Sequence, residues 1–383
     1  MSTKRPSIND PTIVIDFESI DDDLRVCSDP SFDRWNNIAC IQMVEISLTR
    51  SLVESMIAFL NLPFAQDPNS ASGEEFRWIC VEIDSCDFPH FDNHDPCLGF
   101  EDCVTLNHIY RLFSTISRRA LTVSIIDSST AVTDLLSIYQ YDPLEMDSLL
   151  LEQKERLYTM HYRTLGHLLQ QSIQLKELSL RLPFADGAHA LFVGLPNAIE
   201  MQELSLVDTL ETQSTQHERG DLLVGEHGDG PVMRLLQNPQ NRLKKLALSN
   251  MGLEDRHLSA LLKVIPVSQI EVLDVSKNMI GLKGMLEFAD LLPKMPYLKR
   301  VDFQGNSWDD SATDRDKVGI ALLKALMENT GIESMNGLVG LPQAELLCHY
   351  LGLNVAGRYL LGLSPQVPLG LWSHILERTS QPK

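Results

Sequence analysis

The stretch from Leu243 to Trp308 repeats itself about once every 28 residues, and this period constrains the fold more than any other feature. Three segments share one register: LKKLALSNMGL (Leu243–Leu253), IEVLDVSKNMI (Ile270–Ile280) and LKRVDFQGNSW (Leu298–Trp308). Each reads LxxLxL, followed by an asparagine at or beside the ninth position and then by a further apolar residue. One such repeat cannot bury its apolar side alone, so the pattern predicts neighbouring repeats stacked into a solenoid.

Two periodicities within each repeat predict a strand followed by a helix. In LxxLxL the fourth and sixth positions alternate with an outward residue, as in a short strand. About fifteen residues after each start, apolar residues recur at the i, i+3, i+4, i+7 spacing of a helix. The helix residues are Leu258, Leu261, Leu262 and Ile265 in one repeat, and Met285, Phe288, Ala289 and Leu292 in the next.

Extending the template along the chain predicts about nine repeats, starting near positions 41, 78, 120, 175, 201, 243, 270, 298 and 332. In some repeats the helix residues come later than fifteen residues after the start, which indicates a loop inserted between the strand and the helix. One such loop is the polar stretch 309–316. Another is the Gly-, His- and acid-rich stretch 211–231, whose glycines indicate disorder. Between Tyr139 and Gln171 we expect an additional helical segment instead of a repeat.

The sequence predicts three parts: an N-terminal cap (1–35), a solenoid with inserted loops (36–340) and a helical C-terminal cap (341–383). Within the last part, Trp372 stands with Leu371, Ile375 and Leu376 at helical spacing. We interpret this group as a cap that packs on the last repeat. The alternative is a motif that docks a partner.

The repeats resemble the ribonuclease-inhibitor-like class of leucine-rich repeats over residues 41–338. This resemblance implies an α/β horseshoe with parallel strands on the concave face and helices on the convex face. The segments Leu353–Leu361 and Val367–Ser380 also resemble the tail of uncharacterised leucine-rich-repeat proteins of diatoms. The resemblance is specific for fold and not for activity.

In this class the ninth side chain bonds backbone groups of the turn. That position holds Asn278 and Asn306 in two repeats but Met251 in a third. The resemblance therefore implies an interrupted ladder at Met251. Either Asn250 compensates by a shift of one residue, or water satisfies the turn.

The charge of the chain narrows the class of partner, and its cysteine content narrows the cellular compartment. Fifty-two acidic against 32 basic residues give a net charge of −20, which disfavours nucleic acid and anionic membranes and favours a basic protein surface. Solubility alone is the simpler explanation of this charge.

No apolar run has membrane-spanning length, and the N-terminus has no signal-peptide stretch. Seven cysteines, an odd number, favour reduced thiols and a cytoplasmic protein, with a nuclear location as the alternative.

The outward strand positions and their neighbours form the candidate surface for a protein partner, because parallel strands stack them into a contiguous stripe. A face that is merely solvated is the alternative interpretation. The candidate residues are Glu82, Ser179, Arg181, Ser205, Asp208, Lys245, Asp274, Lys277, Arg300, Asp302 and Gln304, with Ser124, Ala247 and Ser249 beside them.

Other chemistry finds little support in the sequence. The segment from His90 to Cys103 carries His, Asp and Cys side chains, but their spacing matches no closed metal site, and an ordinary polar insertion explains them better. No nucleophile-elbow, phosphate-loop, metalloprotease or dinucleotide motif occurs. We therefore expect a non-enzymatic interaction scaffold without cofactor or metal. The alternatives are a GTPase-activating protein of the leucine-rich-repeat type and a substrate adaptor of a ubiquitin ligase.

Overall fold

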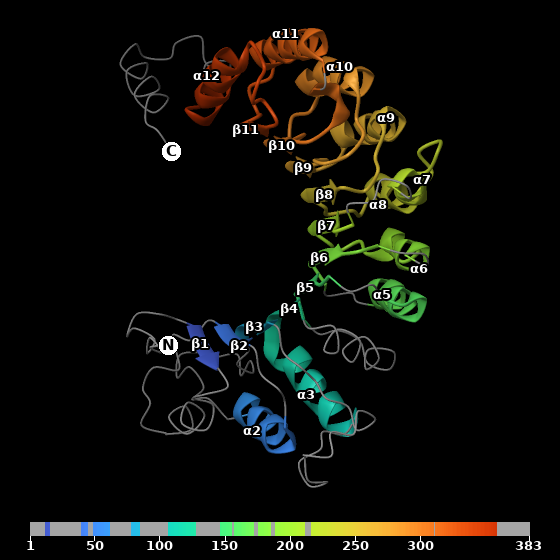
Figure 1. The fold of residues 1–383 in the computed structure, drawn as a ribbon, viewed down its shortest axis with the longest axis vertical. Helices are drawn as coiled ribbons and strands as arrows, with labels where there is room; N and C mark the ends of the chain where they lie inside the picture. The colour runs from blue at the N-terminus through green and yellow to red at the C-terminus, as the bar shows by residue number, and fades with distance from the viewer. Residues whose placement is uncertain are drawn as a thin grey trace. The chain divides into compact units, whose positions relative to one another are not determined.

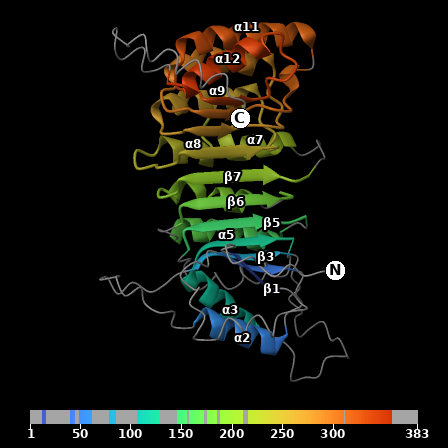
Figure 2. The same cartoon turned by 90° about the vertical axis from the view of Figure 1, so that its left-hand side faces the viewer.

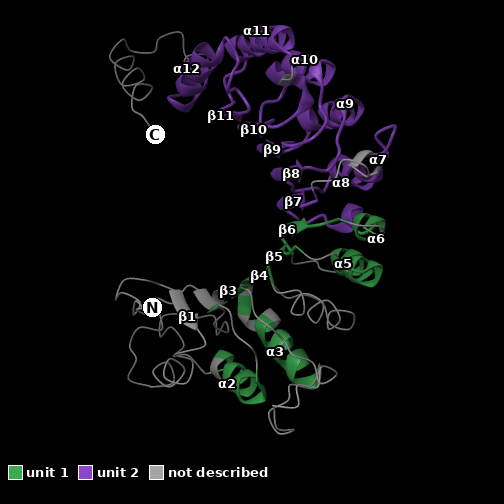
Figure 3. Cartoon of the chain, viewed as in Figure 1, with its two compact units in different colours: residues 1–194 green, residues 195–383 purple. Residues whose placement is uncertain are grey.

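The computed structural model describes residues 12–15, 40–44, 49–61, 78–84, 106–127, 146–154, 157–171, 175–184, 188–210, 216–309 and 311–357. The chain divides into two compact units, residues 1–194 (unit 1) and residues 195–383 (unit 2) (Figure 3). Each unit is described by itself.

Unit 1 is a parallel sheet whose strands follow one another in chain order, with helices on one side of the sheet (Figures 1 and 2). Its strands are β1 (Thr12–Ile15), β2 (Cys40–Val44), β3 (Trp78–Asp84), β4 (Ala120–Ile126), β5 (Ser148–Glu152) and β6 (Glu177–Leu182). Its helices are α2 (Arg50–Leu60), α3 (Leu106–Arg119), α5 (Thr159–Gln171) and the single turn α6 (His189–Phe192).

Unit 2 repeats the same arrangement, with each strand paired in parallel to the next. Its strands are β7 (Glu203–Asp208), β8 (Lys245–Ser249), β9 (Val272–Asp274), β10 (Arg300–Asp302) and β11 (Ser334–Asn336). Its helices are α7 (Gln216–Val224), α8 (Pro231–Gln237), α9 (Asp255–Val264), α10 (Leu282–Leu291), α11 (Ala312–Glu328) and α12 (Ala344–Val355). Short 3-10 turns are η2 (Leu195–Asn197), η4 (Ile265–Val267), η5 (Leu292–Lys294) and η6 (Ser307–Asp309). The expected α/β leucine-rich-repeat solenoid is confirmed.

The core of each repeat lies between its strand and its helix. In the repeat that starts at Leu243, the fourth and sixth positions, Leu246 and Leu248, are fully buried, as is the first helix residue, Leu258. Met285 occupies the same place one repeat later and is also buried. Exposure of either helix residue would have overturned the repeat register, which is therefore confirmed for these repeats.

Two strands lie outside the predicted repeats. β1 falls within the segment expected to form an N-terminal cap, and it pairs in parallel with β2. β5 falls within 139–171, where we expected a helical segment without a repeat. That expectation is wrong, because Met146, Leu149 and Leu151 are buried at the first, fourth and sixth template positions, and α5 follows them.

The register of the repeat at β2 also differs from the prediction. Ile41 pairs opposite Val81 and Met43 opposite Ile83, and these two partners are the inward residues of β3. Ile41 is therefore the fourth position and not the first, so the repeat begins three residues earlier than expected. Its start lies outside the described residues.

Both insertions in unit 2 contain helical structure. The stretch 309–316 was predicted to be a loop, but it lengthens the following helix, because α11 begins at Ala312 and is 17 residues long against 10 for α10. The stretch 211–231, expected to be disordered, contains α7. The loop around 89–103 lies outside the described residues.

Helix α7 is held by polar contacts and by a close approach to α9. The side chain of His257 accepts a hydrogen bond from the Glu254 N–H through Nδ1 (2.9 Å). Its other nitrogen, Nε2, therefore carries the proton and donates to the Asp221 carboxylate on α7 (2.9 Å). Gly220 faces the same ring, and a Cβ there would lie 2.6 Å from its Cε1 atom.

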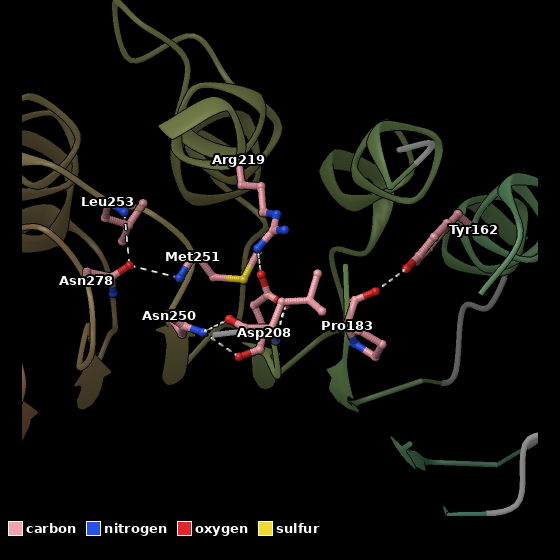
Figure 4. Close-up of polar contacts among 9 residues, drawn as sticks. Tyr162, Pro183, Asp208, Arg219, Asn250, Met251, Leu253 and Asn278 are labelled. Carbon is pink, nitrogen blue, oxygen red and sulfur yellow. Dashed lines mark hydrogen bonds and ion pairs between the residues drawn. The ribbon is translucent and has the colours of Figure 1, made fainter. Parts of the chain in front are cut away.

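Asparagine side chains connect successive turns of unit 2 (Figure 4). The Oδ1 atom of Asn278 accepts the N–H groups of Met251 (2.9 Å) and Leu253 (3.0 Å) in the preceding repeat. Its Nδ2 atom donates to the carbonyl of Leu248 (2.7 Å) and to two carbonyls of its own repeat. Asn306 continues the ladder by accepting the N–H of Ile280 (3.1 Å). These bonds satisfy backbone groups that the turns bury.

Where the ladder has Met251, the preceding residue takes over. Asn250 adopts a left-handed conformation (φ 59°) and donates from Nδ2 to the carbonyls of Asp208 (2.8 Å) and Leu210 (2.9 Å). The left-handed region is more accessible to asparagine than to most residues. Of the two alternatives, the shift of one residue to Asn250 is the one observed, while the Met251 side chain is buried in the core.

Candidate interaction face

The candidate surface is the side of each sheet turned away from the helices, which we call the open face. Side chains alternate along a strand, so the fifth position of every repeat points to this face while the fourth and sixth point to the core. Strand register places fifth-position residues of neighbouring repeats opposite one another. From β3 to β6 of unit 1 this row is Glu82, Ser124, Leu150 and Ser179, and in unit 2 it is Ser205, Ala247, Asp274, Asp302 and Asn336.

In unit 1, Glu82 and Ser179 occupy fifth positions as expected, but β4 and β5 separate their strands. Arg181 stands beside Ser179 at the edge of β6 and forms an ion pair with Glu152 (3.6 Å). The structure therefore does not bring the candidate Glu82 together with the other two.

In unit 2, the structure brings most candidates together. Ser205, Asp274 and Asp302 stand in the fifth-position row. Lys245 and Arg300 occupy the third position of their repeats and Gln304 the seventh. Lys277 occupies the eighth position of its repeat, where the backbone is left-handed (φ 56°). Lys277, Arg300 and Gln304 are exposed, and Lys245 is bound to Glu203 (2.9 Å).

The sequence predicts Asp208 to lie on the interaction surface, and this prediction is wrong. Asp208 is 3% exposed and forms an ion pair with Arg219 of α7, while its Oδ1 atom accepts the N–H of Leu210 (2.9 Å) (Figure 4). The alternation that buries Leu204 and Leu206 continues through the end of β7, so it turns Asp208 inward as well. This carboxylate anchors α7 and does not face a partner.

The strongest local feature of the open face is a pair of aspartates on β9 and β10. Asp274 pairs directly opposite Asp302 in the parallel register. Each carboxylate accepts a backbone N–H two residues later, from Ser276 (2.8 Å) and from Gln304 (2.9 Å). Asp302 also accepts the Nδ2 group of Asn336 (2.8 Å). Both carboxylates are thus fixed in orientation before any partner arrives.

The sequence prediction missed two members of the rows. Leu150 was missed with the whole repeat of β5, and it places an apolar side chain in the row of unit 1. Asn336 was missed although its repeat was recognised. Counting to the fifth position from Met146 and from Ile332 would have found both.

Ion pairs link neighbouring repeats along the borders of the open face. Lys299 contacts Glu271 at 2.6 Å, which lowers the pKa of the glutamate and raises the pKa of the lysine. Both groups stand at the second position of their repeats. Lys176 and Asp147 (2.7 Å) hold the equivalent positions in unit 1. In each of these pairs the acid belongs to the earlier repeat and the base to the later one.

Within the described ranges, no three His, Cys, Asp or Glu side chains gather in a way that could hold a metal ion. The predicted candidates of the segment His90–Cys103 lie outside those ranges. Over the same described ranges, no helix has both the length and the apolar character needed to cross a bilayer.

Comparison of the sequence with protein-family models and with curated proteins gives no match. Among solved structures, the chain is similar to the actin-binding site 2 of leiomodin-1 (20% identity, 46% of this chain and 93% of that one, TM-score 0.36). It is also similar to a chain of the yeast complex of Rad7 and Elc1 (18% identity, 67% and 66%, TM-score 0.38). A third is the tropomodulin C-terminal domain of Caenorhabditis elegans (12% identity, 61% and 98%, TM-score 0.27). At this level of similarity, neither activity nor partner carries over to this chain.

Proposed function

We propose that this chain is a non-enzymatic scaffold of the ribonuclease-inhibitor-like class that binds a protein through the open face of its sheet. The pre-oriented aspartate pair Asp274 and Asp302 carries the proposal. Two carboxylates held opposite each other on adjacent strands repel one another, and a cation from a partner relieves that repulsion. The partner that fits is a protein segment bearing lysine or arginine.

The geometry favours binding because little freedom is lost when the partner arrives. Ordering a side chain at an interface costs about 0.5–1.5 kcal/mol, and the backbone bonds to Ser276 and Gln304 have already ordered the two carboxylates. Asn336 fixes the second oxygen of Asp302. A basic side chain of the partner therefore meets two carboxylates whose orientation these hydrogen bonds have already fixed.

Charge reversal of the pair tests the proposal. The variant Asp274→Lys/Asp302→Lys changes the net charge by the same amount as Asp290→Lys/Glu328→Lys, which alters exposed residues on α10 and α11. Partners captured from the native cell by the wild-type chain are then titrated against both variants. We expect the open-face variant to lose at least about tenfold in affinity, or 1.4 kcal/mol, and the helix-face control to retain binding.

Retention of every captured partner by the open-face variant would refute the proposal. A GTP hydrolysis assay with stoichiometric protein and small GTPases addresses the enzymatic alternative, since stimulation there would replace a passive scaffold with a GTPase-activating role. Recovery of ubiquitin-ligase subunits bound independently of the open face would instead point to an adaptor.

A further inference from the structure

A groove opens at one edge of unit 2, between the carboxyl ends of the neighbouring helices α8 and α9 (Figure 1). Its volume of about 290 Å³ is close to the lower limit for ligand-binding pockets, which suits a few side chains of a peptide. Leu236 and Val264 line the groove and are buried, whereas Val267 on η4 is 83% exposed. The groove therefore offers an apolar contact that the fold itself leaves uncovered.

Two asparagines that line the groove present hydrogen-bond donors to it. The Oδ1 atom of Asn238 accepts the N–H of Gln240 (3.0 Å), and the Oδ1 atom of Asn241 accepts the N–H of Leu243 (2.9 Å). With each oxygen engaged in its own loop, the NH₂ group of each amide is left for a ligand. Such donors suit a carboxylate, which only accepts hydrogen bonds.

The charge of the groove has the same preference. Among the described residues that line it, Lys263 alone is charged, and it forms no ion pair with any other described residue. Arg242, beside the groove, is paired with Glu200 (2.6 Å). The positive charge offered to a ligand is thus that of Lys263.

The surrounding sequence is basic although the whole chain is acidic. Residues 231–270 contain six lysines and arginines against two acids, while the chain has a net charge of −20. The two acids, Glu254 and Asp255, stand at the other end of α9. Along a helix the step from Asp255 to Lys263 is roughly 12 Å, beyond the screening length of about 8 Å at physiological ionic strength. These acids therefore leave the charge at the groove largely intact.

The helix ends oppose an anion only weakly. The carboxyl end of a helix carries a partial negative charge on its free carbonyl groups, but hydrogen bonds occupy some of these groups here. The carbonyl of Leu235 accepts the N–H of Asn238 (3.2 Å), and that of Ile265 accepts both the N–H (3.1 Å) and the hydroxyl (2.9 Å) of Ser268. The full charge of the Lys263 ammonium outweighs the partial charge that remains.

We propose that this groove binds an extended segment of a partner protein in which an aspartate or glutamate stands beside an apolar residue. The carboxylate contacts Lys263 and the amide groups of Asn238 and Asn241, and the apolar side chain packs on Val267. The groove shares no residue with the aspartate pair of the open face, which favours a basic partner. The inference therefore does not depend on the proposed function.

Selection of peptides from a random heptapeptide library on the immobilised full-length chain supplies the probe. We expect one class of enriched peptides to carry aspartate or glutamate next to an apolar residue. Basic peptides, if they are enriched, report on the open face instead. Enrichment without an acidic and apolar class would overturn the proposal, whether or not basic peptides appear.

Fluorescence anisotropy with the most enriched acidic peptide then locates its binding site. Lys263→Glu is expected to lower the affinity by at least about tenfold, because attraction becomes repulsion, and Val267→Ser by a smaller factor. The matched control is Lys324→Glu, the same charge change at an exposed lysine near the carboxyl end of α11. Equal losses for Lys263→Glu and Lys324→Glu, or no loss for either, would overturn the proposal.

Two other occupants are distinguished by separate measurements. Sedimentation of the wild-type chain is expected to give a mass that Lys263→Glu leaves unchanged, and a dimer that this variant dissociates would assign the groove to a second copy. Inorganic phosphate is expected not to displace the peptide at equal concentration, and displacement would assign the groove to a phosphate group. Either assignment would overturn the proposal.

Discussion

At the scale of single residues, the amide side chains in the turns carry much of the specificity of this fold. Asn278 makes five hydrogen bonds from one side chain, and two of its partners are backbone N–H groups of the preceding repeat. Leaving a buried polar group without a partner costs about 1–3 kcal/mol, more than the net gain of a typical hydrogen bond. The side chain therefore acts mainly by preventing that penalty.

We predict that Asn278→Ala lowers the free energy of unfolding by about 2–5 kcal/mol, because the N–H groups of Met251 and Leu253 lose their acceptor. Urea denaturation measures the change. The control is Asn336→Ala, where the asparagine is exposed and the expected change is within about 0.5 kcal/mol. Equal effects for the two variants would show that the ladder is not what stabilises the turns.

A second residue-scale prediction concerns His161 at the start of α5. Its Nδ1 accepts the N–H of Tyr158 (3.3 Å), and burial lowers its pKa. The unfolded chain then binds a proton at higher pH than the folded one. Stability is therefore fully present above about pH 6.5 and falls as the pH decreases from there to the lowered folded pKa.

The variant His161→Gln is expected to flatten the stability profile below about pH 6.5, as measured by urea unfolding at each pH. The matched control is His167→Gln, an exposed position on the same helix. An unchanged slope for His161→Gln, or the same flattening for both variants, would contradict this assignment.

At the scale of elements, α7 shows how an insertion becomes part of the fold. The helix approaches α9 so closely that only glycine fits at position 220, because a Cβ there would lie 2.6 Å from the His257 ring and 2.7 Å from the carbonyl oxygen of Gly252. Its charged contacts, Arg219 with Asp208 and Asp221 with His257, fix its two sides. Removing one partner of a buried ion pair typically costs about 3–5 kcal/mol.

We predict that Gly220→Ala destabilises unit 2 by about 1–3 kcal/mol through overpacking and increases hydrogen exchange across 216–224. The control is Gly331→Ala, where the nearest atom to an added Cβ is 3.4 Å away. Exchange in α7 that is unaffected by Gly220→Ala would mean that the helix is not held against α9.

Some repeats and surface residues could be predicted from the sequence, and others could not. The repeats that start at Leu243, Ile270 and Leu298 follow from the sequence pattern, whereas the repeat at Met146 is equally buried but was not recognised. Asp208 was assigned to the surface because its charge outweighed the strand alternation, and only Arg219, 11 residues later in an insertion, explains its burial. Long-range partners of this kind leave no periodic signal. The aspartate row on β9 and β10, in contrast, followed from the repeat spacing alone.

At the scale of the whole molecule, the excess of acid opposes folding. A net charge of −20 produces self-repulsion, while the exposed ion pairs between repeats contribute only about 0–1 kcal/mol each. Salt weakens both effects. The repulsion involves more charges and acts over longer distances, so screening reduces it more.

We therefore expect the Tm to rise when NaCl increases from about 0.01 M to about 0.15 M, over which the screening length falls from about 30 Å to about 8 Å. Differential scanning fluorimetry measures the change, and an equal concentration of uncharged sucrose serves as the control for solute effects. A Tm that falls with salt would show that the ion pairs outweigh the repulsion.

The charge alternation at the second position has a consequence for how the strands find their order. Glu271 stands between Lys244 and Lys299, each at the second position of its repeat, and Val272 stands between Lys245 and Arg300 at the third. If β8 paired with β10 and left β9 out, two lysines would meet at one border, and a lysine would meet an arginine beside them. Like charges directly opposite on paired strands are destabilising. The sequence thus penalises a mispaired solenoid that omits a repeat, although every repeat has nearly the same apolar pattern.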